Sequence, residues 1–357
     1  MVKNVFWNYE EGRLRALWRQ VMQLLFYFLL IGVMIYIIPW GLAFLLIALH
    51  IVLHLLFHIS LPPTSRLLEL PRNSLIGASA VLLSVWITVR LFNREALALF
   101  GFRFSKAWWA DFLFGCLLGF ALNAGVFLVE WLVGWVSIKQ LFSNGVTSFP
   151  FAVVLCMGFV NFLLVALFEE TLARGYPLRN FAQACNIAAL GPQKAILLCW
   201  LLTSFVFGFG HYANPHVTVL ELLSISIAGL LMGLGYIFTG NLGLSIGLHM
   251  AWDFAQGNVF GFSVAGQSLS SSASVFSLRQ AGPELWTGGR VGPDGGLLSI
   301  CAFLFGMMAL VCYVRWRYGN IALHTSLAHF HRREARKTQG RTVFGIVPDE
   351  DDVSVSN

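Results

Sequence analysis

Two adjacent acids, Glu169 and Glu170, interrupt a strongly apolar part of the chain and could perform acid/base chemistry there. They follow an almost uninterrupted apolar run that begins at Pro150. A charge at the bilayer centre costs about 2.5–3.5 kcal/mol, so it normally faces a bundle interior or an aqueous cavity. Arg174 lies one helical turn after Glu170 and could pair with it, which would leave Glu169 available. A simpler interpretation is that both acids cap a span at the headgroup level.

Two later apolar runs carry imidazoles that suit the same chemistry. Phe207 and His211 form an FxxxH pattern beside glycines, which permit close approach of a helix or a substrate. His249 and Asp253 are at i and i+4, so they share one helix face and could orient an imidazole, bind a metal or stabilise an oxyanion. Each pattern alone could be an interfacial histidine or a self-contained His–Asp contact. Three polar motifs on separate apolar runs favour a shared site.

In this order the motifs suggest hydrolysis of an amide inside a water-filled cavity. A free carboxylate and an imidazole would activate water, and a second histidine with a polar partner would hold the tetrahedral intermediate. Two histidines and one or two carboxylates also make a plausible zinc set, with Glu169, His211, His249 and Asp253 as candidate ligands. The sequence contains no HExxH zinc signature. It therefore leaves open whether a divalent metal such as zinc takes part.

A separate histidine pattern lies earlier in the chain. His50, His54 and His58 are spaced at i, i+4 and i+8, which could bind a metal. No acid occurs within that apolar run, which ends near Pro62 and Pro63. We therefore expect a polar stripe for helix contact, with ligand binding or a route into the cavity as the alternatives.

The elements that must position these residues follow from composition. The 357 residues are 57% hydrophobic and only 11% charged, against about 25% charged in soluble domains. Apolar runs of spanning length predict an all-α, polytopic transmembrane bundle of about eight helices (seven to nine) around a hydrophilic cavity. The runs lie near 20–38, 41–58, 74–92, 110–135, 150–168, 195–210, 217–238, 241–256 and 297–315. For Glu169 and His211 to meet, the helix that starts near Pro150 must continue past the acids to about Pro177.

Charge placement predicts the topology. The basic residues are spread over loops and tails, which indicates membrane orientation rather than nucleic-acid binding. Arg315, Arg317 and the basic residues after them predict a cytoplasmic C-terminus. The N-terminal tail is also basic, which nine full crossings cannot accommodate, so either one early segment is re-entrant or the count is eight. We divide the chain into an N-terminal polar tail (1–19), N-terminal spans (20–109), a catalytic membrane core (110–316) with an extracytoplasmic Gly/Ser-rich loop (257–296), and a cytoplasmic tail (317–357).

In sequence order, three motifs resemble the CAAX protease and bacteriocin-processing family of intramembrane endopeptidases, which includes the type II CAAX prenyl proteases. They are EExxxR at Glu169–Arg174, FxxxH at Phe207–His211 and HxxxD at His249–Asp253. The resemblance covers about residues 105–315 and includes the glycine-rich turn Thr287–Gly296. It implies a multi-pass protein of a bacterial cell membrane that hydrolyses a peptide bond. Its partners would be membrane lipid and a peptide or lipidated protein, such as a prenylated CAAX-type substrate. The oligomeric state is not indicated.

The resemblance also implies roles for the motif residues. Glu169 would be the water-activating base with His211 as its partner, and His249 and Asp253 would stabilise the oxyanion. The family has Asn or Asp at the position of Asp253. An ionised Asp would repel an oxyanion, so Asp253 would have to be protonated, paired with His249 or bound to a metal.

Glu170 and Arg174 would hold the site together. Ala173 departs from the family, in which a bulky aromatic residue is common there, and this affects packing more than chemistry. Two other function classes are open to a chain with this sequence. One is a non-catalytic membrane scaffold or immunity protein that keeps the fold. The other, less favoured, is a proton-coupled transporter that uses the buried acids as a relay; no inverted hydropathy repeat supports it.

Overall fold

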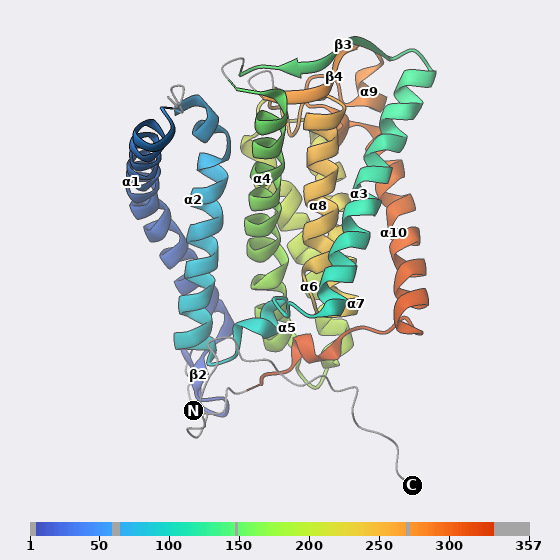
Figure 1. Ribbon diagram of the computed structural model, residues 1–357. Helices are drawn as coiled ribbons and strands as arrows, with labels where there is room; N and C mark the ends of the chain where they lie inside the picture. The colour runs from blue at the N-terminus through green and yellow to red at the C-terminus, as the bar shows by residue number, and fades with distance from the viewer. Residues whose placement is uncertain (1–4, 59–64, 147–148, 269–271, 332–357) are drawn as a thin grey trace.

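The computed structural model describes residues 5–58, 65–146, 149–268 and 272–331, so most of the predicted tail 317–357 lies outside the described residues. The chain forms a helical bundle (Figure 1). Among the described residues, seven helices are long and apolar enough to cross a membrane. The predicted all-α polytopic bundle and its range of seven to nine helices are therefore confirmed, and the protein is an integral membrane protein.

The elements follow the predicted apolar runs closely. The helices are α1 (Ala16–Phe57), α2 (Ser65–Thr88), α3 (Lys106–Leu132), α4 (Phe151–Glu170), α5 (Pro177–Cys185), α6 (Gly191–Gly210), α7 (Val219–Thr239), α8 (Gly243–Phe254), α9 (Glu284–Thr287) and α10 (Leu297–Tyr318). The strands are β1 (Trp7–Asn8), β2 (Arg13–Leu14), β3 (Val136–Asn144) and β4 (Ala273–Gln280).

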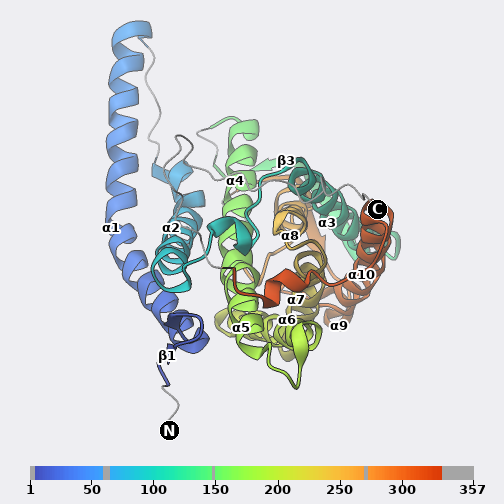
Figure 2. The same ribbon diagram turned by 90° about the horizontal axis from the view of Figure 1, so that it is seen from below.

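The prediction of two spans at 20–38 and 41–58 was wrong, because α1 is one continuous helix of 42 residues that contains Pro39. At 1.5 Å per residue such a helix is about 63 Å long, roughly twice the hydrocarbon thickness of a bilayer. Proline is tolerated inside a helix in lipid, where an interrupted backbone would have no water to bind. Its second half extends well beyond the bundle (Figure 2).

Joining these two segments leaves eight helices that run along the bundle among the described residues: the seven apolar helices α1, α2, α3, α4, α6, α7 and α10, and the shorter α8, which a π-helical turn extends to Val259. An even number of passes returns the chain to its starting side, and Figure 1 shows β2 and the end of α10 at the same end of the bundle. Both basic ends of the chain can then lie on one side without a re-entrant early segment. That this side is cytoplasmic stays a prediction.

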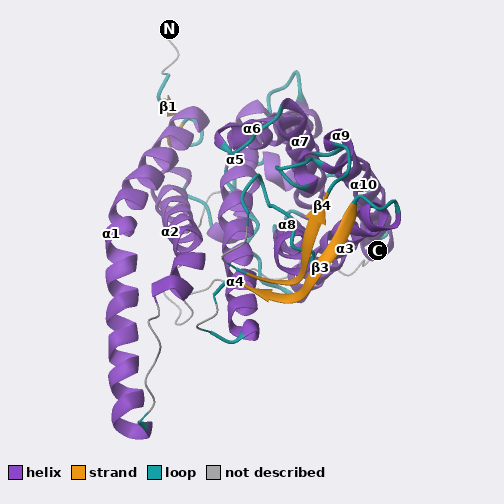
Figure 3. Ribbon diagram, turned by 90° about the horizontal axis from the view of Figure 1, so that it is seen from above, coloured by secondary structure: helices purple, strands orange, loops and turns teal. Residues whose placement is uncertain are grey.

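A two-stranded ribbon, not foreseen from the sequence, covers the opposite end of the bundle (Figure 3). β3 follows α3, and β4 lies within the segment 257–296 that was expected to be a loop. The strands pair antiparallel from Val136–Gln280 to Asn144–Ala273, with an irregularity between Ile138 and Gln140. The pairing joins segments far apart in the sequence, so no local pattern announced it.

α4 carries Glu169 and Glu170 into the interior of the bundle, because the helix does not end at the two acids. After Glu170 the helix continues through a π-helical turn, Thr171–Gly175, and then into α5 at Pro177. Pro177 has no N–H to continue the regular hydrogen-bond ladder, and a π turn is a common irregularity at functional sites. The predicted continuation past the acids to about Pro177 is confirmed.

α8, which bears the His249–Asp253 motif, is held against α3 by glycines. A Cβ atom at Gly115 or Gly119 would collide with the backbone carbonyl of Leu244 or Leu248, respectively. On the other side of the contact, a Cβ at Gly247 would collide with the Phe112 carbonyl. The two backbones therefore touch along several turns, which fixes the depth and rotation of α8.

Candidate functional site

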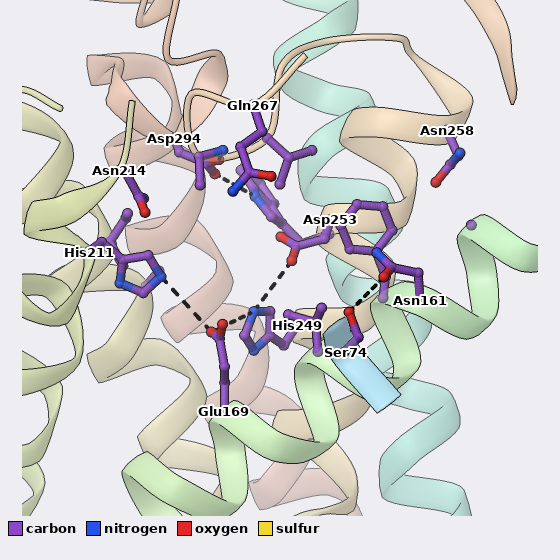
Figure 4. A pocket seen from close by; sticks show the side chains of 18 of the residues that line it. Ser74, Asn161, Glu169, His211, Asn214, His249, Asp253, Asn258, Gln267 and Asp294 are labelled. Carbon is purple, nitrogen blue, oxygen red and sulfur yellow. Dashed lines mark hydrogen bonds and ion pairs between the residues drawn. The ribbon is translucent and has the colours of Figure 1, made fainter. Parts of the chain in front are cut away.

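A cavity of about 760 Å³ lies inside the bundle, lined chiefly by side chains of α4, α6, α7 and α8 and by the loops near β3 and β4. Glu169, His211, His249 and Asp253 all line it. Figure 4 shows these four side chains pointing toward one another across the cavity. The sequence placed them on separate apolar runs, and the fold brings them to one depth.

Glu169 stands between the two imidazoles. Its Oε2 atom is 3.9 Å from Nε2 of His211 and 3.8 Å from Nε2 of His249. Its side chain is 22% exposed, in contrast to the complete burial of Glu170. A carboxylate that is partly open to the cavity and has two nearby nitrogens can accept a proton from a bound water.

The protons on both histidines can be assigned in part from their partners. Nδ1 of His211 lies 2.9 Å from the carbonyl oxygen of Phe207. A carbonyl only accepts hydrogen bonds, so Nδ1 carries a proton and the neutral ring presents the Nε2 lone pair to Glu169. Nδ1 of His249 lies 2.9 Å from Oε1 of Glu170, which also accepts from Arg174. His249 therefore donates through Nδ1 and turns Nε2 toward the cavity.

Asp253 lies one helical turn after His249, and its Oδ2 is 3.5 Å from Nε2 of that ring. Nε2 of His249 thus faces two carboxylates, those of Asp253 and Glu169. With Nδ1 already protonated, a proton on Nε2 makes an imidazolium that both acids stabilise. The alternative is a neutral ring that accepts from a protonated Asp253.

Glu170 and Arg174 form a buried ion pair beneath the site. Nη1 of Arg174 donates to Oε1 of Glu170 at 2.6 Å, and both side chains are fully buried. The predicted i, i+4 pair is confirmed. The guanidinium also lies 3.9 Å from the ring centroid of Phe207, a desolvated cation–π contact that can contribute about 2 kcal/mol. That ring in turn packs edge-on against His211 and His249.

Asp294 lines the same cavity and was not identified from the sequence. Its Oδ1 accepts from the indole of Trp252, and its Oδ2 accepts from Nε2 of Gln256 and the backbone N–H of Ala265. Burial raises the pKa of Asp294, and these hydrogen bonds oppose that shift. The turn Thr287–Gly296 stands out in the sequence for its glycines. The residue of this turn that lines the cavity is its acid, Asp294.

The rest of the polar lining is rich in carboxamides, which the sequence analysis also missed. They are Asn73, Asn161, Asn214, Asn258 and Gln267. Ser74 of α2 donates to Asn161 of α4 at 2.6 Å, so one of these amides joins two helices beside the cavity. Isolated amides in a sequence give no local signal of a site, because they are common at helix contacts.

Within the described part of the chain, no group of three or more His, Cys, Asp or Glu side chains is arranged to hold a metal ion. The candidate zinc set therefore does not form a metal centre in this arrangement. The earlier histidine pattern lies on α1, where His54 and His58 are exposed and contact each other. None of its members lines the cavity, so it offers no route into it.

Comparison with protein families agrees with the motifs. Residues 150–255 match the family model described as type II CAAX prenyl endopeptidase Rce1-like. The segment begins beside α4 and contains all four cavity-lining motif residues. No curated protein and no solved structure matches the chain. The resemblance is confirmed for this segment, which is an Rce1-like domain and supports a protease of the CAAX endopeptidase kind.

Proposed function

We propose that the protein is an intramembrane endopeptidase that hydrolyses a peptide bond of a membrane-associated substrate, of which a prenylated CAAX-type protein is one example. The observation that carries this proposal is the convergence of Glu169, His211, His249 and Asp253 on one cavity. The Rce1-like match over residues 150–255 supports the same reaction class. Membrane lipid would surround the bundle, and the peptide would enter the cavity.

In the proposed reaction, Glu169 takes a proton from a water while the water oxygen bonds to the carbonyl carbon. His211 supports this step, because its Nε2 lone pair can accept a second hydrogen bond from the same water. The 3.9 Å between Oε2 and Nε2 leaves room for one water to donate to both atoms. General-base catalysis of this kind typically contributes about 10²- to 10⁴-fold in rate.

The oxyanion that forms on the former carbonyl would be held by His249. Since Nδ1 already donates to Glu170, the ring can donate through Nε2 only as an imidazolium. Asp253 is then its counter-ion, which explains how an acid can stand beside an oxyanion. When the tetrahedral intermediate collapses, the C–N bond breaks and the proton held by Glu169 passes to the leaving amine.

Glu170 and Arg174 act as positioning residues in this scheme. Glu170 fixes the orientation of the His249 ring, and Arg174 neutralises Glu170 in a fully buried setting. A buried carboxylate without a cation would be strongly destabilised. The pair therefore keeps Glu170 ionised, so that it accepts rather than donates at Nδ1 of His249.

The test is peptide cleavage by the purified protein in detergent or liposomes, comparing wild type with Glu169→Gln. We expect the variant to lose at least about 10²-fold in kcat/KM, because the amide cannot take the proton. A Glu284→Gln variant, on α9 away from the cavity lining, is the matched control. Each protein is assayed with and without a chelator, which reports separately on metal dependence.

The same variant separates the rival function classes. A scaffold or immunity protein would complement a deletion equally well with Gln at position 169, and no peptide would be cleaved by the wild type. A proton-coupled transporter would show substrate uptake driven by a pH gradient in liposomes. Either result, with no cleavage by the wild-type protein, would overturn the proposal.

A further inference from the structure

The described lining of the cavity contains several carboxylates and no Lys or Arg. The carboxylates are those of Glu169, Asp253 and Asp294. The nearest cation to Glu169 along the chain, Arg174, is fully buried and committed to Glu170. A substrate carboxylate beside Asp294 would therefore meet a like charge, and the only lining groups that could carry a positive charge are the imidazoles of His211 and His249, beside Glu169 and Asp253. A basic side chain would meet carboxylates of opposite charge.

Asp294 differs from the other two lining acids in its partners. Glu169 and Asp253 each face an imidazole that can carry a positive charge. Asp294 accepts only from neutral donors, namely an indole, a carboxamide and a backbone amide. An ionised carboxylate offers about four lone-pair positions, so three donors leave one position on Oδ1. In its ionised form it has no cation among the described residues that contact it.

A second observation at the same cavity is an unpartnered acceptor that a peptide could satisfy. Asn258 is fully buried and lines the cavity, and its Nδ2 donates to Ser272 and to the carbonyl of Ala273. Its Oδ1 is buried with no hydrogen-bond partner among the described residues. An unsatisfied buried acceptor is costly, and a main-chain N–H of a bound peptide would satisfy it. Figure 4 shows Asn258 beside the cavity, on the other side of Asp253 from Asp294 and Gln267.

We propose that the cavity selects its peptide by charge, with Asp294 as a specificity-determining residue that faces a basic side chain near the scissile bond. An acidic residue at the same place is rejected. The preferred substrate is an extended peptide with Lys or Arg close to the cleaved bond. This inference rests on the proposed peptidase function and adds the substrate class.

The experiment uses wild-type protein and three quenched fluorescent peptides that differ only in one residue, which is Lys, Gln or Glu. The series is repeated at each of three positions on either side of the cleaved bond. At one position we expect kcat/KM to fall in the order Lys, Gln, Glu, with the extremes at least about tenfold apart. A Lys-to-Glu ratio within twofold at every position would overturn the proposal, whatever the variants do.

Two variants then locate the effect. Asp294→Asn removes the charge, and we expect the Lys-to-Glu ratio to collapse toward one. Asp294 also accepts three hydrogen bonds, so its substitution could disturb the local structure as well as the charge. Gln267→Lys is therefore a second variant, which adds a cation at the same end of the cavity and leaves those hydrogen bonds in place (Figure 4). It should likewise lower the ratio. Gln140→Lys, exposed on β3, is the matched control and should leave the ratio unchanged.

The outcomes also distinguish a failure of the charge-selection proposal from a failure of the proposed peptidase function. Cleavage of the Gln peptide that disappears in Glu169→Gln, together with no charge preference, overturns only the selection by charge. No cleavage of any peptide by wild type overturns the peptidase itself. A charge preference that survives both Asp294→Asn and Gln267→Lys overturns the assignment to Asp294.

Discussion

Glu169 and Glu170 are neighbours in the chain, but one side chain is partly open to the cavity and the other is fully buried. Glu170 is fully buried and receives hydrogen bonds from Arg174 and from Nδ1 of His249. Glu169 is turned by about 100° around the helix and opens on the cavity between two imidazoles. One acid is thereby a fixed structural charge, and the other is free to exchange a proton.

The buried pair should show strong coupling in stability. Arg174→Met leaves Glu170 as an uncompensated buried charge, and removing one partner of such a pair costs about 3–5 kcal/mol. Glu170→Gln combined with Arg174→Met should cost less than the sum of the two single variants, by about 0.5–3 kcal/mol. Denaturant unfolding in detergent micelles measures all four proteins. Costs that simply add would show that the two charges do not stabilise each other.

Position 253 tests how the oxyanion is held. Asp253→Ala removes the counter-ion of His249, and loss of an oxyanion donor lowers kcat by about 10²- to 10³-fold. Asp253→Asn should retain far more activity, because its amide can donate a hydrogen bond to the oxyanion directly. Steady-state cleavage by the three proteins gives the comparison. Equal losses in both variants would mean that the charge of Asp253 itself is required.

α8 is the element on which the site depends most. It has only 12 residues, yet it carries both His249 and Asp253, and its Trp252 donates to Asp294. Its position is set by backbone contact with α3 at Gly115, Gly119 and Gly247. This close backbone contact fixes the depth at which α8 presents its polar side chains.

A methyl group at Gly119 should disturb the site from the opposite side of α8. The Cβ of Gly119→Ala would collide with the carbonyl of Leu248, adjacent to His249. Overpacking of this kind costs about 1–3 kcal/mol, and the shift of α8 should lower kcat as well. Gly125→Ala on the same helix is the control, since nothing lies within 4 Å of its added Cβ. Equal behaviour of the two variants in unfolding and cleavage assays would contradict the close contact.

At the scale of the whole molecule, the eight passes determine what lies on each side of the membrane. Arg13 and Arg15, just before α1, lie at the same end of the bundle as Arg315 and Arg317 at the end of α10, and the β3–β4 ribbon covers the other end (Figure 1). Arg and Lys in short segments beside spans favour the cytoplasmic side. We therefore propose that the ribbon and α9 are extracytoplasmic and that the chain beyond α10 is cytoplasmic.

This orientation can be measured by labelling single cysteines in intact cells. The six native cysteines are free among the described residues and would first be replaced. A cysteine at Ser137, exposed on β3, should react with a membrane-impermeant maleimide from outside. A cysteine at Asn320, exposed after α10, should react only after permeabilisation. Labelling of both positions from the same side would refute the eight-pass arrangement.

Local relationships in this protein could be predicted from the sequence. The i, i+4 spacings of Glu170 with Arg174 and of His249 with Asp253 translate directly into contacts at 2.6 Å and 3.5 Å. The apolar runs gave the spans, because hydrophobic length is a property of a single segment. The one failure among spans, at Pro39 in α1, arose because two hydrophobic runs and one long helix have the same composition.

Contacts between distant segments were decided by the tertiary structure alone. Glu170 meets His249 across 79 residues, and Asp294 meets Trp252 across 42. The strand pairing of β3 with β4 is of the same kind. What the sequence determined by itself was the membrane class, the motifs and their local pairing, since periodicity and hydrophobic length act within one segment. The packing of separate helices decides which acid faces the cavity and which loop completes the cavity. That packing exists only in the assembled bundle.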